Sequence, residues 1–275
     1  MYKMKKFFVI PFVLLLSSCS SDDNDTLPEP TCLITKFNKA NIINGQQFYT
    51  SEYVYDGNLI IKKLDYNIVD NTPSGQTYPT YTLQLKATTE IQYNALKQPV
   101  KIIEGVDYNN MQNIDYLQYD NQGRLSEKNR VSTYLTDNTS STKNFKYTYS
   151  STNKIVLIAE KITNSWGDVY GENTKTLSYD TNGNLKEIEQ INAGNSALKV
   201  VTKYDNYDTY KNPYANVNVP FEDIFFLRLS KNNHRKYSKT TYMNGYPTPP
   251  YETYEISGYE YNEHGYPKFA EYKCN

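Results

Sequence analysis

The sequence YDTNGNL at residues 179–185 recurs with little change as YDNQGRL at residues 119–125. In both stretches a tyrosine and an aspartate precede a short polar segment with a glycine, and a leucine follows. The aspartate can cap a turn through its own backbone, and glycine adopts the positive φ that other residues resist. The aromatic and aliphatic residues on either side suit the two strands of a pleated sheet. Each stretch, called a YD phrase below, therefore predicts a β-hairpin.

Looser copies of the YD phrase follow one another along the chain. They lie at residues 53–59, 93–100, 147–155 and 259–267. The tyrosines at 93, 119, 149 and 179 are separated by 26, 30 and 30 residues, a period typical of one supersecondary unit per repeat. A lone hairpin cannot bury its face, so the repeats need one another. We predict an all-β fold, an antiparallel meander of roughly a dozen strands that forms one curved, partly barrel-like sheet of hairpin repeats.

Two local features depart from the regular pattern. Leu185 and Ile188 are three residues apart, which would place them on opposite faces of a regular strand. We therefore expect a bulge there, or a leucine that still lies within the turn. Residues 220–227 (PFEDIFFL) begin with a proline and two acidic residues in the first turn, as helices often do. We predict one short helix near residues 220–229, packed over a sheet edge or the open end of the curled sheet.

Composition excludes two classes of protein. The chain of 275 residues contains 29 tyrosines, whose rings pack while their hydroxyls stay wet on a half-buried sheet. A mean hydropathy of -0.73 excludes a polytopic membrane protein. The formal net charge of -1 gives no basic surface for nucleic acid, so we expect no nucleic-acid partner.

The beginning of the chain is typical of a lipoprotein signal peptide. Three lysines precede a short apolar run at residues 7–16, which suits a signal sequence and is too short to span a bilayer. LSSC at residues 16–19 resembles a bacterial lipobox, and this resemblance implies that Cys19 is acylated and anchors the protein to a membrane. The alternative is an ordinary secretory signal in which this cysteine occurs by chance.

Ser21, Asp22 and Asp23 lie just after the expected lipid attachment site. A Ser-Asp-Asp run in this place resembles the surface-export signal of Bacteroidota lipoproteins. It implies a lipid-anchored outer-membrane protein that faces the cell surface, and the alternative is a solvated acidic linker on a periplasm-facing lipoprotein. We expect a signal peptide at residues 1–18, the lipidated cysteine with a flexible acidic tether at 19–31, and a single β-repeat domain at 32–275.

The other two cysteines, Cys32 and Cys274, flank the expected domain. Both would sit in an oxidising compartment, where a disulfide would tie the first strand to the last. A disulfide that closes so long a loop lowers the conformational entropy of the unfolded chain, which stabilises the fold by up to ~5 kcal/mol. The alternative is two unpaired thiols.

Two resemblances to known proteins cover most of this domain. The YD phrases resemble the YD repeats of Rhs-type shell proteins over residues 53–269. The order of Tyr-Asp at 204–205, Asn-Pro-Tyr at 212–214 and Ser-Lys-Asn-Asn at 230–233 resembles a family of Bacteroidota lipoproteins of unknown function with a porin-like fold. That second likeness spans about residues 32–274. It implies a strongly curved antiparallel sheet, and it supplies no activity.

The sequence offers few residues for catalysis. The two histidines, His234 and His264, lie in turn-like contexts, and no nucleophile, phosphate-loop or metalloprotease motif is present. Glu187 and Glu189 could form a carboxylate pair for glycoside hydrolysis, but such charges usually mark the solvated side of a strand. We therefore predict no catalytic residue, no metal site and no cofactor.

Exposed aromatic residues are the candidates for ligand contact. Trp166, the only tryptophan, lies in a probable hairpin tip, and Tyr246 and Tyr251 belong to a second aromatic stretch rich in proline. Such rings can stack on the apolar faces of sugars, and the alternative is that they cover or fill the sheet.

Three functions are compatible with these residues. The first is a non-enzymatic surface lipoprotein that binds or adheres to a glycan or a protein. The second is a structural, periplasm-facing lipoprotein that supports an envelope complex. The third is a carbohydrate-active enzyme.

Overall fold

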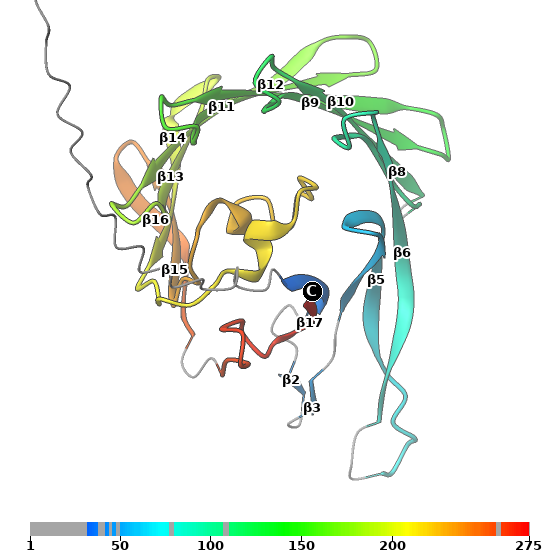
Figure 1. Ribbon diagram of the computed structural model, residues 1–275. Helices are drawn as coiled ribbons and strands as arrows, with labels where there is room; N and C mark the ends of the chain where they lie inside the picture. Colours follow the sequence, from blue (N-terminus) through cyan, green and yellow to red (C-terminus); the bar gives the residue numbers. More distant parts are fainter. Residues whose placement is uncertain are drawn as a thin grey trace, which may run out of the picture. The chain divides into compact units, whose positions relative to one another are not determined.

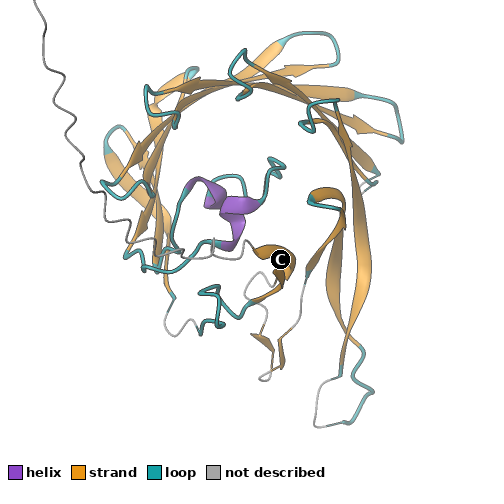
Figure 2. Cartoon of the chain, in the orientation of Figure 1, coloured by secondary structure: helices purple, strands orange, loops and turns teal. Residues whose placement is uncertain are grey.

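The computed structural model describes residues 32–37, 42–43, 46–47, 50–76, 80–106, 110–256 and 260–274. The chain divides into the units Met1–Pro30 and Thr31–Asn275, and all described residues belong to the second unit. Nearly all of its regular structure is β-strand (Figure 2).

The strands of the first half are β1 (Cys32–Phe37), β2 (Ile42–Ile43), β3 (Gln46–Gln47), β4 (Ser51–Asp56), β5 (Leu59–Asp70), β6 (Tyr81–Tyr93), β7 (Pro99–Glu104), β8 (Met111–Tyr119) and β9 (Leu125–Tyr134). Those of the second half are β10 (Ser140–Tyr149), β11 (Ile155–Asn164), β12 (Val169–Tyr179), β13 (Leu185–Asn192), β14 (Asn195–Asp205), β15 (Lys236–Met243), β16 (Tyr246–Glu255) and β17 (Ala270–Cys274). Two 3₁₀ helices, η1 (Pro213–Asn216) and η2 (Leu227–Leu229), lie between β14 and β15.

Fifteen of these strands form one antiparallel sheet, and β2 and β3 form a separate pair. From β4 to β16 each strand pairs with its neighbours in sequence, which confirms the predicted meander. β1 breaks this order because it lies between β4 and the last strand, β17. The sheet curves strongly (Figure 1), but its end strands β16 and β17 do not pair, so it does not close.

The YD phrases form the tight turns at one end of the sheet. In the phrase at residues 179–185, Asp180 Oδ1 accepts a hydrogen bond from Asn184 N at 2.8 Å, and Gly183 has a φ of 93°. This is the turn chemistry that the sequence predicted. Asn153 occupies the matching place in an earlier repeat with a φ of 59°, a conformation that asparagine tolerates better than most residues.

In five of the YD phrases, those from residue 53 to residue 185, a tyrosine hydroxyl donates a hydrogen bond to a backbone carbonyl of an earlier strand. Tyr207, after β14, makes the same kind of contact. The described pairs, at 2.5 to 2.9 Å, are Tyr55 to Ile34, Tyr93 to Ile60, Tyr119 to Pro99, Tyr149 to Leu125, Tyr179 to Ile155 and Tyr207 to Leu185. Burial raises the pKa of Tyr93 and Tyr207 to about 12, so these hydroxyls remain donors at neutral pH. We call this row the tyrosine ladder.

A bulge follows the turn, as expected. Tyr179 pairs with Leu185 and Ser178 pairs with Glu187, so Lys186 is the extra residue of β13. The shift brings Leu185 and Ile188 to the same buried side, where they are 1% and 5% exposed. The spacing of three residues is thereby reconciled with a single apolar face.

Residues 217–229, called the inner segment here, lie within the curve of the sheet (Figures 1 and 2). Val217, Val219, Phe221 and Ile224 pack in one apolar cluster with the strands at the β1 side, and Phe225 packs in a second cluster with β10 to β14. The predicted helix is short: turns occupy residues 222–226, and only η2 is helical. Neither 3₁₀ helix of the described chain has the length and apolarity needed to cross a membrane.

The other 3₁₀ helix, η1, was not predicted from the sequence. Asn212 caps it by accepting a hydrogen bond from Tyr214 N at 3.0 Å. The same side chain donates to the carbonyls of Leu227 and Ser230. Asn212 therefore joins the two 3₁₀ helices.

A disulfide joins the first strand to the last. Cys32 and Cys274 are direct partners in the β1–β17 pairing, with their Cα atoms 4.0 Å apart. The predicted disulfide is therefore present, and it joins the first described residue to the last.

Candidate functional site

The buried side of the sheet is apolar near the YD turns and polar farther along the strands. On β8 the buried Leu117 is followed toward the other end by the buried Asp115. The same change occurs on β11, from Ile158 to Glu160. Buried charges are costly unless they are paired, so the polar half is where a functional arrangement is expected.

Arg130 on β9 is the centre of this polar half. Its guanidinium binds Asp115 with two hydrogen bonds, at 2.7 and 3.0 Å, and Glu104 at 2.5 Å. A third carboxylate, that of Glu222 in the inner segment, also accepts a hydrogen bond from it. Although burial lowers the pKa of Arg130, these carboxylates outweigh it and hold the pKa above its ordinary value.

Lys63 on β5 forms a second, smaller centre. Its ammonium lies 3.0 Å from Asp65 and 2.9 Å from Asp223 of the inner segment. It also lies 5.4 Å from the centre of the Phe221 ring. Burial alone would lower the pKa of Lys63, but the two carboxylates raise it. Glu222 and Asp223 thus connect the inner segment to two strands by ion pairs.

A cavity of about 660 Å³ opens between these two centres. Strands β5 to β9 and residues 221–223 of the inner segment supply most of its lining. Lys86 and Asn67 line it with exposed side chains that make no hydrogen bond or ion pair to other described residues. The Glu222 side chain is 54% exposed and uses one oxygen for Arg130. Donors and acceptors are therefore free in the cavity.

The charged side chains around the cavity include one more carboxylate than cations. The cations are Lys63, Lys86, Lys128 and Arg130, and the anions are Asp65, Glu104, Asp115, Glu222 and Asp223. Carboxylates that share a cation keep lone pairs for further hydrogen bonds. The cavity therefore suits a neutral or amine-bearing ligand with several hydroxyl groups better than an anion.

The aromatic residues singled out in the sequence lie elsewhere, on the outside. Trp166, in the β11–β12 turn, is 82% exposed, and Tyr246 and Tyr251 on β16 are 75% and 55% exposed. Three strands, β13 to β15, separate Trp166 from Tyr246. At the usual spacing of adjacent strands, this places them roughly 20 Å apart, so they do not form one compact site.

Glu187 and Glu189 form cross-strand ion pairs on the sheet. Glu187 lies 3.5 Å from Lys203, and Glu189 lies 3.1 Å from Lys199. Opposite charges facing each other across strands are an ordinary stabilising feature of sheets. This arrangement favours a solvated strand face over a catalytic carboxylate pair.

The two histidines have different surroundings. His234 is packed edge-on against Tyr204, with ring centres 5.0 Å apart, and burial lowers its pKa to about 4. It is therefore a packed neutral ring, although its sequence context is turn-like. His264 lies in a turn beside the disulfide.

Several expected site residues lie outside the described residues. These are Cys19, Ser21, Asp22 and Asp23, so the lipid anchor and the export signal remain predictions from the sequence. Conversely, sequence reasoning missed Lys63, Arg130 and Glu222. For Lys63 and Arg130 the only local signal was a charged residue at a buried strand position, and Glu222 stood out only as an acidic residue of a helix start. Neither pattern can identify partners that are 92 residues apart, as Arg130 and Glu222 are.

Comparisons with known proteins give similarities of fold. One solved structure, a porin-like protein from Bacteroides vulgatus, aligns with a TM-score of 0.42 and 14% identity, covering 76% of this chain and 95% of that chain. Another, a porin-like protein from Bacteroides uniformis, aligns with a TM-score of 0.46 and 12% identity, covering 88% of this chain and 93% of that chain. No family model and no curated protein matches the chain.

Proposed function

We propose that this chain is an envelope lipoprotein that binds a glycan without catalysing a reaction. The observation that carries the proposal is the polar cavity beside Arg130, with its free donors and acceptors and its excess of carboxylate. Sugars present many hydroxyls that donate and accept hydrogen bonds, which matches this lining. Tyr66 adds aromatic surface for the apolar face of a ring.

The binding test compares cavity variants with variants of the exposed aromatics. The purified, oxidised domain would be screened against a glycan array, and hits would be measured by calorimetry. Asn67→Ala and Lys86→Ala should each weaken binding about tenfold, because each removes roughly one hydrogen bond to the ligand. Both residues are exposed, so the fold should be unaffected.

Trp166→Ala and Tyr246→Ala are the matched controls, since both change exposed residues away from the cavity. They should leave glycan affinity unchanged. Loss of binding in these variants, with normal binding by Asn67→Ala and Lys86→Ala, would move the contact to the outer aromatics and contradict the cavity. Failure of every glycan to bind would favour the structural role in an envelope complex.

The proposed location of the domain is the cell surface, where a lipid would anchor it to the outer membrane. Cys19 would carry the lipid, and Ser21, Asp22 and Asp23 would direct the domain to the cell surface. Protease treatment of intact cells, followed by blotting, should digest the domain. Protection until the outer membrane is broken would reject surface exposure, and a Cys19→Ala variant that still carries lipid would reject the lipobox.

A further inference from the structure

The two cysteines are held together by more than their disulfide. β1 and β17 pair over five residue pairs, from Cys32 with Cys274 to Phe37 with Ala270. These backbone contacts place the two Cα atoms 4.0 Å apart. If the sulfur–sulfur bond were reduced, the strand pairing would still present two thiols side by side.

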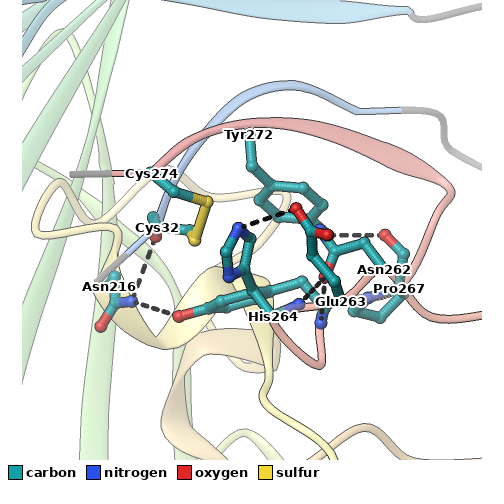
Figure 3. Close-up of a disulfide and its surroundings, with 9 residues drawn as sticks. Cys32, Asn216, Asn262, Glu263, His264, Pro267, Tyr272 and Cys274 are labelled. Carbon is teal, nitrogen blue, oxygen red and sulfur yellow. Dashed lines mark hydrogen bonds and ion pairs between the residues drawn. A yellow bond between two sulfur atoms is a disulfide. The ribbon is translucent and has the colours of Figure 1, made fainter. Parts of the chain in front are cut away.

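His264 is brought to the same place by a separate turn. Asn262 Oδ1 accepts hydrogen bonds from His264 N at 3.1 Å and from Tyr266 N at 2.9 Å. This turn sets the imidazole beside the sulfurs (Figure 3). One ligand atom from each of Cys32, His264 and Cys274 lies within 4.8 Å of the others. Two independent elements therefore bring together two sulfurs and one imidazole.

We propose that reduction of the Cys32–Cys274 disulfide creates a Zn²⁺-binding site formed by Cys32, Cys274 and His264. A thiol or phosphine reductant supplies two electrons, the sulfur–sulfur bond breaks, and each sulfur takes up a proton. Zn²⁺ then displaces both protons and binds two thiolates and the neutral imidazole. This is a common donor set for zinc, with one coordination position left over.

The surroundings suit such a site. Glu263 Oε1 lies 3.5 Å from His264 Nε2 (Figure 3), where it can orient the ring or add an oxygen ligand. Cys32 is 1% exposed, whereas Cys274 and His264 are partly exposed. A metal ion would therefore approach from the side of Cys274 and His264. The oxidised protein offers no thiolate, so binding depends on the redox state.

The test uses Co²⁺, a spectroscopic substitute for Zn²⁺, added anaerobically to the mature domain. After reduction with a phosphine, the domain should bind one Co²⁺ and show thiolate-to-cobalt charge-transfer absorption, which added Zn²⁺ should abolish. The oxidised domain should show none. Circular dichroism recorded on the same samples reports whether the reduced domain keeps its sheet.

Two variants separate the site from adventitious binding. Cys32→Ser with Cys274→Ser should abolish the charge-transfer absorption, and His264→Ala should weaken Co²⁺ binding at least about tenfold while both thiols remain. A reduced domain without this absorption, folded or unfolded, would overturn the proposal. Equal Co²⁺ affinity in His264→Ala would also overturn it. Glycan binding is measured on the oxidised domain, so the two proposals fail independently.

Discussion

At the scale of single residues, the tyrosine of a YD phrase combines two roles. Its ring packs against the apolar half of the sheet, and its hydroxyl binds a carbonyl of the preceding repeat, as Tyr179 does with Ile155 at 2.9 Å. The neighbouring Asp180 instead serves its own turn. A Tyr-Asp pair therefore couples one contact between repeats to one contact within a repeat.

Removing one hydroxyl of the tyrosine ladder should cost about 1 kcal/mol. Tyr179→Phe keeps the ring but deprives the Ile155 carbonyl of this donor. The free energy of unfolding, measured in urea, should fall by that amount. Tyr170→Phe is the control, because Tyr170 is 62% exposed and its loss should matter little. Equal effects of the two variants would contradict a stabilising role for the ladder.

His234 should make stability depend on pH in the acid range. Its pKa is about 4 in the folded state and 6.5 ordinarily, so below pH 6.5 the unfolded chain binds a proton that the folded chain does not. Stability therefore falls as pH drops from about 6.5 to 4, by up to roughly 3 kcal/mol in total. His234→Phe should lose this part of the pH dependence in urea unfolding measured between pH 4 and pH 7.5. If the free energy of unfolding of His234→Phe depended on pH as strongly as that of the unchanged protein, this role of His234 would be refuted.

At the scale of elements, the inner segment packs against the curved sheet from within. Its apolar residues fill the space against the strands, and its two acidic residues bind Arg130 and Lys63. The local sequence does not predict these ion pairs, because their partners are far apart in the chain. Asp223 and Lys63, for example, are separated by 160 residues. The helix-start pattern predicted a helix near residues 220–229, whereas the structure has turns at residues 222–226 and only η2 is helical.

Ile224→Ala should destabilise the domain by about 2 to 5 kcal/mol. Ile224 is 1% exposed within the first apolar cluster, and truncation there leaves a cavity. Leu96→Ala is the matched control, because Leu96 is 79% exposed in a turn. Thermal unfolding should show a large fall in midpoint for the first variant and almost none for the second. A small effect of Ile224→Ala would mean that the inner segment is dispensable for stability.

At the scale of the whole described unit, the disulfide closes the chain. Cys32 and Cys274 are separated by 242 residues, so the bond strongly restricts the unfolded chain. Replacing both cysteines with serine should lower the free energy of unfolding by up to about 5 kcal/mol. Urea unfolding of the oxidised protein and the double variant checks this. Equal midpoints, or equal gel mobility of the oxidised and reduced protein, would contradict it.

The sequence by itself determined the β-hairpin repeats and the tyrosine-rich sheet. It also offered the bulge after Tyr179 and the disulfide of the two domain cysteines, each as one of two alternatives, and the structure has both. Each depends on local turn chemistry, on alternation along a strand, or on there being two cysteines left to pair. The tertiary structure alone decided the polar cavity, the ion pairs of the inner segment and the position of His264 beside the disulfide. All three features bring together residues that are distant in the chain. The alternation of residues along a strand predicts which face of the sheet a side chain occupies, but it does not predict which side chains it contacts there.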